Sequence, residues 1–412
     1  MSDPTREAAF DLLSAVLGRR RPLEEALDAL PEMPARDRAA AHRLAATVLR
    51  RMGTLDAVLE PLLRRQPPEP ARHVLRIGAA GLLLLDTPRH AAVGTAVALA
   101  RARGLAPFAG LANAVLRRVA DAGPQAIEEL DTPRLDTPAW LWASWGPDAR
   151  AIALAHQHEA PLDLTLRPGG EAPAGGAMLP TGSLRFPPGT RVADIPGFAT
   201  GDWWVQDAAA ALPARLLAVH PGEAVADLCA APGGKTAQLA ASGAAVTAVE
   251  RDAARLRRLR DNLRHWRLQA DAVQADAAKW QPPAPFDAVL LDAPCSATGT
   301  IRRHPDVLRL KRPQDVRALT EAQDRLLDAA AGMLRPGGRL LYSVCSLQPE
   351  EGPARVAAAL ARGRVRHDPF AAAELPDLPE AITPEGYLRT HPGMWVELGG
   401  MDGFFAARLV RT

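Results

Sequence analysis

The chain has 412 residues, 48% of them hydrophobic and 23% charged, and its formal net charge is +2. This composition excludes a disordered or fibrous chain, and the length predicts two or three globular domains. Three cysteines in so long a chain exclude a disulfide framework and fit a reducing compartment. Since no secretory signal pattern opens the sequence and the apolar run at 78–85 is too short to span a bilayer, we expect a cytoplasmic protein without a membrane partner.

Residues 1–140 are predicted to form a small all-helical domain. Apolar residues recur at helical spacing at 9–17, 40–51, 54–63, 71–85, 91–103 and 111–120. Proline and glycine separate these stretches, and no strand-like alternation interrupts them.

Residues 141–215 differ in texture from the helical region. Trp140, Trp142 and Trp145 precede a segment rich in proline and glycine at 167–176 and a second one at 187–189. We expect a small connecting α/β module with a loose hairpin here.

From residue 216 to 412, short apolar runs alternate with helical stretches. Helices are expected at 253–265 and 323–334, between strands at 224–228, 245–249, 270–274, 288–291 and 339–343. This alternation predicts a doubly wound, mostly parallel sheet. A last pair of strands is expected around 395–398 and 403–409.

The turn after the first of these strands is the candidate cofactor site. It opens a helix and consists of Cys229, Ala230, Ala231, Pro232, Gly233, Gly234 and Lys235. Glycines let a ligand approach the backbone, and the start of a helix favours negative charge. A phosphate loop would need glycine in place of Cys229, and a dinucleotide fingerprint would need Gly-x-Gly-x-x-Gly, so both fit poorly.

S-adenosylmethionine fits this turn better than a nucleotide phosphate does. Glu250 ends the second strand, where an acid can bond both ribose hydroxyls, and Asp276 follows the third, where an acid can accept from the adenine amine. Either acid alone would more simply be a helix cap or a solvated turn residue. Their joint position after the glycine turn favours the cofactor.

Two cysteines follow the fourth and fifth strands of the predicted sheet. Cys295 lies in Asp-Ala-Pro-Cys-Ser and Cys345 in Tyr-Ser-Val-Cys-Ser, so both thiols are expected at the carboxyl edge, where ligands bind. A free cysteine is most often a small core residue, but the polar flanks of these two are unlike a core. Cys229 keeps the core interpretation.

A pair of thiols suits methylation at carbon 5 of a pyrimidine. A thiolate that adds at carbon 6 makes carbon 5 nucleophilic enough to take a methyl group from a sulfonium. Asp292 could serve nitrogen 3, and a second thiol could help to remove the carbon 5 proton before elimination. The main alternative, methylation of an exocyclic amine, usually has Pro-Pro and an aromatic residue after the strand-four acid, where this chain has Ala293, Pro294 and Cys295.

At the positions 227–236, 292–296, 303–306, 342–346 and 402–405 the chain resembles RNA 5-methylcytosine methyltransferases of the Sun/Fmu type, bacterial enzymes that act on small-subunit ribosomal RNA. The resemblance implies a Rossmann-like class I methyltransferase core at 216–412, S-adenosylmethionine as cofactor, RNA as partner and no metal. It also implies that Cys345 is the nucleophile and Cys295 the thiol that helps to release the product, an order that the residues alone do not give.

The same resemblance places other residues at the cofactor or the base. Cys229 to Lys235, Glu250, Asp276 and Asp292 would border S-adenosylmethionine, and Lys235 and Asp292 would touch the target base. The same chemistry on transfer RNA remains an alternative, as does a non-catalytic RNA-binding or assembly factor with a relic methyltransferase fold.

The helical region resembles NusB, an RNA-binding helical fold, at 36–38, 88–93 and 113–118. An all-α NusB-like domain at 1–140 is therefore expected in front of the α/β core. Gly352 stands where the Sun/Fmu type usually has asparagine, Pro168 and Gly169 replace Val-Asn, and Val344 replaces threonine. None of these departures touches the thiols, the acids or Lys235.

Overall fold

The computed structural model describes residues 3–412, which form two compact units. One unit contains the chain up to His158 together with Ile301–Lys311, and the other contains Glu159–Thr300 and Arg312–Thr412. Among the described residues, no helix combines the length and the apolar character needed to cross a membrane.

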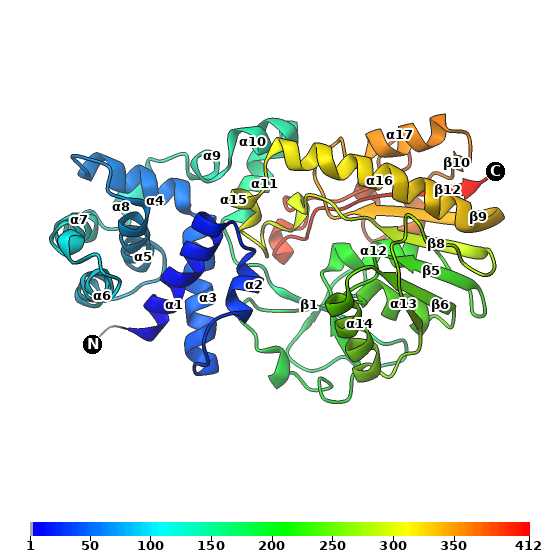
Figure 1. Cartoon of the computed structure of the whole chain (residues 1–412), viewed down its shortest axis with the longest axis horizontal. Helices are drawn as coiled ribbons and strands as arrows, with labels where there is room; N and C mark the ends of the chain where they lie inside the picture. Colours follow the sequence, from blue (N-terminus) through cyan, green and yellow to red (C-terminus); the bar gives the residue numbers. More distant parts are fainter. Residues whose placement is uncertain (1–2) are drawn as a thin grey trace. The chain divides into compact units, whose positions relative to one another are not determined.

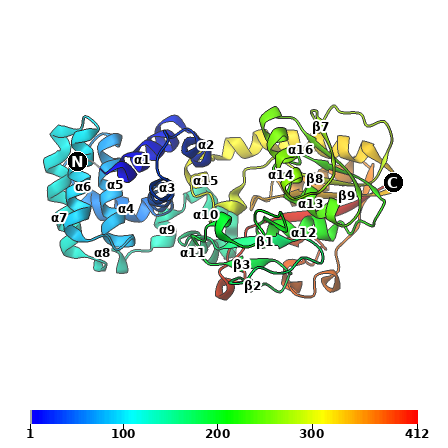
Figure 2. The ribbon, with the colours of Figure 1, turned by 90° about the horizontal axis from the view of Figure 1, so that it is seen from below.

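The first unit is helical, as predicted. Its helices up to His158 are α1 (Pro4–Leu13, continued by a π-helical turn, Ser14–Gly18), α2 (Leu23–Asp28), α3 (Ala35–Arg50), α4 (Met52–Leu59), α5 (Glu69–Leu84), α6 (Arg89–Ala102), α7 (Ala109–Ala122), α8 (Gln125–Glu128), α9 (Thr132–Asp136), α10 (Ala139–Trp145) and α11 (Ala149–His156). Helices α5, α6 and α7 pack on one another (Figure 2). Gly78 permits this packing, because a Cβ atom there would lie 2.4 Å from Leu116 Cδ1.

The segment Ile301–Lys311, with α15 (Val307–Leu310), also belongs to the helical unit. The Leu23 amide donates to Asp306 Oδ2 at 3.0 Å, and Arg50 Nη2 donates to the Arg302 carbonyl at 3.1 Å. Arg309 Nη2 donates to the Asp136 carbonyl at 3.0 Å. The sequence pattern did not predict that these eleven residues leave the α/β region for the helical unit.

The second unit begins with a four-stranded antiparallel sheet in the order β2-β3-β1-β4. Its strands are β1 (Leu162–Leu166), β2 (Ala177–Met178), β3 (Leu184–Phe186) and β4 (Trp203–Val205), and α12 (Ala208–Leu216) follows. Buried Arg185 pairs with buried Asp163 through two hydrogen bonds, Nε to Oδ1 at 2.6 Å and Nη2 to Oδ2 at 2.7 Å. The three-domain division at 140 and 215 remains a prediction.

The main sheet has the order β10-β12-β9-β8-β5-β6-β7, with β11 paired to β12. The strands are β5 (Ala224–Leu228), β6 (Ala245–Glu250), β7 (Asp271–Gln274), β8 (Phe286–Asp292), β9 (Leu334–Val344), β10 (Val365–His367), β11 (Leu388–Arg389) and β12 (Phe405–Arg411). Neighbouring strands from β5 to β9 pair in parallel, and β12 pairs antiparallel with β9. The predicted doubly wound, mostly parallel sheet is confirmed.

One predicted strand is wrong. The stretch around 395–398 forms a 3₁₀ turn, Val396–Leu398. Trp395 has a φ of +53° and Gly399 one of +97°, so the backbone turns there instead of extending. The antiparallel neighbours of β12 on that side are β10 and β11, which the sequence pattern did not predict.

Helices cover both faces of the main sheet (Figure 1). On one face lie α12, α13 (Gly234–Ala241) and α14 (Ala253–His265), and on the other α16 (Pro313–Met333) and α17 (Pro353–Ala361). Helix α14 has the predicted bounds, whereas α16 starts at Pro313, before the predicted 323. Proline suits a first helical turn, and the Asp315 carboxylate accepts from the Arg312 amide there at 2.9 Å.

Candidate active site

The two cysteine-bearing loops leave neighbouring parallel strands at the same edge of the main sheet. Strand β8 pairs with β9 so that Asp292 lies opposite Ser343, and each strand ends within a few residues of a cysteine. The Sγ atoms of Cys295 and Cys345 lie 3.4 Å apart. The structure therefore brings together the two thiols that the sequence pattern placed at one edge.

Lys235 and Asp292 form an ion pair at this edge. Lys235 Nζ lies 2.8 Å from Asp292 Oδ2, and the Ser343 hydroxyl donates to Asp292 Oδ1 at 3.1 Å. Burial alone would lower the pKa of Lys235, but the attraction of Asp292 and of a charged Cys345 outweighs it and raises the pKa above its usual value. Lys235 is thus held as an ammonium group, with its Nζ 5.1 Å from the centre of the Phe404 ring.

The protonation of Cys295 depends on its neighbour. Its hydrogen bond with Cys345, followed by burial and the negative charges of Cys345 and Glu351, raises the pKa of the Cys295 thiol well above its usual value. The Cys295 thiol is therefore protonated at neutral pH.

Cys229 differs from the other two cysteines. Burial, followed by the negative charges of Glu250 and Asp292, raises the pKa of its thiol to about 12. The thiol is therefore protonated at neutral pH and inert, as expected for a structural cysteine. Its backbone lies in the left-handed region, with a φ of +62°.

The turn from Cys229 to Lys235 joins β5 to α13, as the sequence predicted. Gly233 precedes the helix with a φ of +106°, a conformation that favours glycine. The Ala230 amide donates to the Val249 carbonyl at 3.2 Å, which ties the turn to β6.

Two buried carboxylates beside this turn have oxygen atoms without a hydrogen-bond partner. Glu250 Oε1 accepts from the Asp252 amide at 2.9 Å, but Oε2 has no hydrogen-bond partner and lies 3.5 Å from Arg255 Nη1. Asp227 Oδ2 accepts from the Thr236 hydroxyl at 2.6 Å, while Oδ1 has no partner. Such oxygens fit the ribose hydroxyls and the ammonium group of S-adenosylmethionine.

Burial is the main reason why the pKa of Asp227 is raised to about 7. The charge of Asp292 adds to this rise, and the Thr236 hydrogen bond opposes it. Sequence reasoning gave no role to Asp227 or to Phe404. Asp227 could have been found as the polar residue within an otherwise apolar buried strand, and Phe404 only through the terminal Asp-Gly-Phe-Phe motif.

Asp276 lies in the turn after β7, as predicted from the sequence, and is half-buried. Its Oδ1 accepts from the Ala278 amide at 3.1 Å, so the side chain also stabilises this turn. A contact with the adenine amine remains a prediction for this residue.

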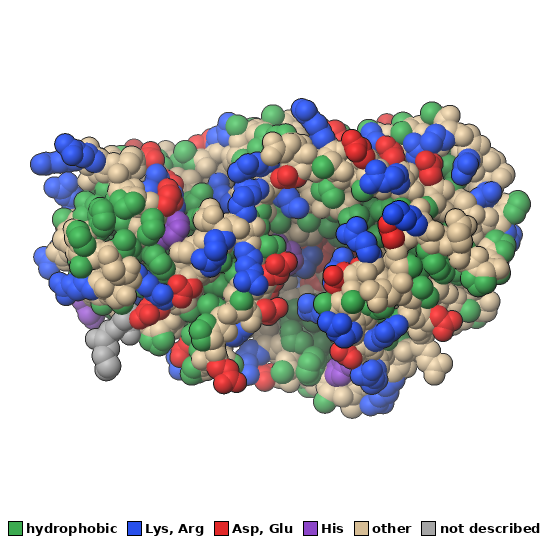
Figure 3. Space-filling model, viewed as in Figure 1, with side chains coloured by type: hydrophobic (Ala, Val, Ile, Leu, Met, Phe, Trp, Pro, Cys, Tyr) green, Lys and Arg blue, Asp and Glu red, His purple; other side chains and the backbone are tan. Residues whose placement is uncertain are grey.

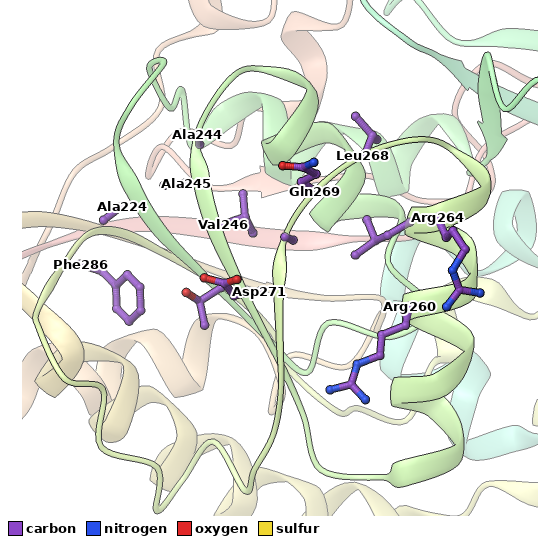
Figure 4. Close-up of a pocket in the computed structure, with 13 residues that line it drawn as sticks. Ala224, Ala244, Ala245, Val246, Arg260, Arg264, Leu268, Gln269, Asp271 and Phe286 are labelled. Atoms are coloured by element: carbon purple, nitrogen blue, oxygen red, sulfur yellow. The ribbon is translucent and has the colours of Figure 1, made fainter.

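A cavity of about 700 Å³ lies at the other end of the strands (Figure 4). It is lined by the first residues of β5, β6 and β7, by Phe286, and by Arg260 and Arg264 of α14. None of the predicted site residues lines it. The cavity is therefore separate from the edge that carries the two thiols.

Comparisons with known proteins match both halves of the chain. The family model described as 16S rRNA methyltransferase RsmB/F matches residues 214–410, and the NusB family model matches residues 3–121. Ribosomal RNA small subunit methyltransferase B of Xanthomonas campestris pv. campestris is 40% identical over 389 residues, which cover 87% of this chain and 88% of its own. The protein of that name from Pseudomonas putida is 35% identical over 437 residues, 98% of each chain.

Solved structures agree with the fold. The crystal structure of PH0851 covers 99% of both chains with a TM-score of 0.74 at 23% identity. The structure of NSun6 from Pyrococcus horikoshii with SFG covers 66% of this chain and 98% of its own, with a TM-score of 0.56 at 18% identity. At these identities the likeness concerns the fold alone. The predicted family, the NusB-like domain and the S-adenosylmethionine dependence are confirmed, and the chain belongs to the 16S rRNA methyltransferase RsmB/F family, with a NusB family domain preceding the methyltransferase core.

Proposed function

We propose that the chain transfers the methyl group of S-adenosylmethionine to carbon 5 of a cytosine in small-subunit ribosomal RNA, through a covalent bond between Cys345 and carbon 6 of the base. The observation that carries the proposal is the 3.4 Å approach of two thiols beside the Lys235–Asp292 ion pair. The names of the relatives supply the substrate class. A relic fold in a non-catalytic factor would need neither the second thiol nor the ion pair.

The ion pair provides a means of choosing cytosine. Nitrogen 3 of cytosine accepts a hydrogen bond and its exocyclic amine donates one, which complements the Lys235 ammonium group and the Asp292 carboxylate. Uracil presents a donor at nitrogen 3 and an acceptor beside it, the reverse pattern. The Lys235 ammonium group can stabilise the negative charge that develops at nitrogen 3 when a thiolate adds to the ring, whereas the Asp292 carboxylate is placed to accept from the exocyclic amine.

The protonation of Cys295 supports Cys345 as the nucleophile. Because the pKa of Cys295 is raised, Cys295 keeps its proton, and the positive charge of Lys235 lies where it would stabilise a thiolate on Cys345. The thiolate of Cys345 adds at carbon 6, which makes carbon 5 nucleophilic enough to take the methyl group that bound S-adenosylmethionine would supply.

Release of the product uses the second thiol. Once the Cys345 sulfur is bonded to carbon 6, the hydrogen bond and the charge that raise the pKa of Cys295 are gone. Cys295 can then lose its proton to solvent, accept the proton from carbon 5, and allow the bond between carbon 6 and sulfur to break. Each thiol thus holds a proton at a different stage.

S-adenosylmethionine supplies an electrophilic methyl group when it is bound. We assign the ribose hydroxyls to Glu250, the ammonium group to Asp227 and the adenine amine to Asp276. The backbone of the turn Cys229–Lys235 would approach the cofactor closely, and Asp292 would border the same site. The unpartnered oxygens of Glu250 and Asp227 support the first two assignments.

A trapping experiment tests the proposal. With RNA and methyl donor, C295A should accumulate a protein–RNA adduct that survives denaturing electrophoresis, while C345A and the C295A/C345A double variant should form none and be inactive. Turnover by C345A would overturn the mechanism, and an adduct in C345A alone would reverse the two roles. An unchanged map of methylated cytosines in the 16S rRNA of a deletion strain would argue against the proposed substrate.

A further inference from the structure

Glu351 joins the two cysteine loops through a single buried carboxylate. Its side chain is fully buried, and the neighbouring Glu350 is exposed. Its Oε1 accepts from the Ser296 amide at 2.8 Å, and its Oε2 accepts from the hydroxyls of both Ser296 and Ser346. These serines directly follow Cys295 and Cys345 in the chain.

Gln323 of α16 completes the arrangement. Its Nε2 donates to Glu351 Oε1 at 3.1 Å and to the Pro294 carbonyl at 2.9 Å. The residues on both sides of Cys295 are therefore bonded to one buried cluster. The Glu351 carbonyl in turn accepts from the hydroxyl of Tyr342 in β9 at 2.6 Å.

We propose that Glu351 is a positioning residue, which fixes the spacing of the two thiols by holding the residue after each. This inference rests on the proposed function. Both serine hydroxyls donate to the same oxygen, Glu351 Oε2. If either cysteine loop moved relative to the other, one of these two hydrogen bonds would lengthen. The donors are neutral, and a buried carboxylate without a cation costs stability, which a purely structural link would avoid.

The charge of Glu351 has a second effect, on protonation. Together with Cys345 and burial, it raises the pKa of Cys295 and so keeps the proton there before attack. Glu351→Gln retains the shape and can still bond both serines, but it removes the charge. Glu351→Ala removes the hydrogen bonds as well as the charge. Comparing the two variants therefore distinguishes the effect of thiol spacing from the effect of charge.

The test uses the full chain with matched variants. Since a displacement of about 1 Å can cost about 100-fold in rate, we expect E351A to lower kcat by about that factor, with the KM for RNA and the Kd for S-adenosylmethionine nearly unchanged. E351Q should retain more activity and shift the acidic limb of the kcat–pH profile to lower pH. Glu350→Ala is the control and should behave as wild type. If E351A fails to fold, kcat and its pH profile can still be measured for E351Q and Ser346→Ala.

Two outcomes would overturn the inference. One is a variant at Glu351 that lowers Tm while kcat and its pH profile stay as in wild type; the other is a change confined to KM or to cofactor affinity. These outcomes can be distinguished from a failure of the proposed function. In that case C345A would retain turnover, whatever the Glu351 variants do.

A separate observation concerns the outer surface of α14. Seven of the residues 251–267 are arginine, and all seven are exposed, whereas lysine and arginine together number 49 in the 412-residue chain. An arginine-rich composition therefore does not by itself explain the cluster. Figure 3 shows Lys and Arg side chains gathered over the region where Figure 1 places α14.

Three of these arginines form a stripe. Arg257, Arg260 and Arg264 follow one another at spacings that place them on one face of α14, and we call this set the arginine stripe. Arg260 and Arg264 also line the 700 Å³ cavity (Figure 4). Like charges at such spacings destabilise a helix, so the stripe is a cost to folding.

We infer that the arginine stripe binds phosphates of the RNA that flanks the target base, an inference that also rests on the proposed function. Helix α14 begins three residues after Glu250, so its first turn lies at the cofactor edge and the stripe runs away from it. Asp261, which pairs with Arg264 at 3.0 Å, leaves most of the positive charge uncompensated. Arginine suits bidentate contacts with phosphate.

Salt dependence of RNA binding tests this surface. Since each neutralised phosphate contributes about 0.7 to 0.9 to the slope of log K against log salt, the triple variant R257Q/R260Q/R264Q should reduce that slope by about 2 and weaken RNA binding. The control R317Q/R364Q/R366Q removes three other exposed arginines of the same unit and should keep the slope. Equal slopes in the two triple variants would overturn the inference. Both triple variants should bind S-adenosylmethionine as wild type does. Turnover by C345A would count against the proposed function and not against the arginine stripe.

Discussion

The Sγ atoms of Cys295 and Cys345 are 3.4 Å apart, although fifty positions separate the two residues in the chain. Parallel pairing of β8 with β9 causes this approach, since the strands end side by side and each loop turns back over the same edge. At this distance the two sulfurs lie within hydrogen-bond reach of each other, so Cys345 affects the protonation of Cys295.

The first prediction concerns that pair. In C345A the hydrogen bond and the charge that raise the pKa of Cys295 are removed, so Cys295 should ionise at a lower pH than in wild type. The measurement is thiolate absorbance during a pH titration of the free protein, with C295A as the control for the remaining thiols. An unchanged titration of Cys295 in C345A would contradict the coupling.

The second prediction concerns Asp227 and stability. Its folded pKa of about 7 exceeds the ordinary 3.8, so between these pH values the folded state holds a proton that the unfolded state has released. Stability is therefore lost as pH rises through this window, by up to about 4 kcal/mol at 1.36 kcal/mol per unit, and the loss stays constant above pH 7.

Asp227→Asn removes this ionisation, so without cofactor its Tm relative to wild type should be higher at pH 8 than at pH 5. Thermal unfolding of both proteins at the two pH values checks the difference. A gap in Tm that is the same at pH 5 and pH 8 would show that Asp227 does not titrate in this range.

The third prediction concerns the cofactor. Glu250 has a buried oxygen without a hydrogen-bond partner, and hydrogen bonds to charged groups contribute about 1.5 to 3 kcal/mol, so Glu250→Ala should weaken S-adenosylmethionine binding about 10- to 100-fold. Calorimetric titration gives the Kd. Glu223→Ala is the control, because Glu223 lies just before β5, at the opposite end of that strand, and should leave the Kd unchanged.

The fourth prediction concerns the Arg185–Asp163 pair in the four-stranded sheet. Arg185 also donates to the carbonyls of Leu398 and Gly400, both at 2.7 Å. Arg185→Leu leaves a buried carboxylate unpaired and should destabilise the second unit by about 3 to 5 kcal/mol. Adding Asp163→Asn should restore part of the loss in Tm; a double variant less stable than R185L would contradict this account.

Strands and helices bounded by strong turn signals were predictable from the sequence. Strand β5 and helix α14 have the predicted bounds, because an apolar run or stripe ends at a turn on each side. The edge that holds both thiols followed from the rule for parallel sheets. The order of the thiols came from family resemblance, and the structure adds the raised pKa of Cys295 in its support.

Other features depend on tertiary structure that no local pattern encodes. The turn at 396–398 resembles a strand in composition, and what distinguishes it is the positive φ of the flanking Trp395 and Gly399. Glu351 looks like any acid in a polar loop until its burial is known. Strand β10 has three residues, too few for a periodic pattern to be read.

The excursion of Ile301–Lys311 into the helical unit has a consequence for how the protein is made. A nascent chain that has left the ribosome up to His158 still lacks the acceptors for the Leu23 amide and for Arg50, and the donor from Arg309. The helical unit therefore cannot form these contacts until the chain has been translated up to residue 311, about halfway through the methyltransferase region at 214–410. A gene fragment cut at residue 158 would encode an incomplete module, which co-expression of a 301–311 peptide should help to stabilise.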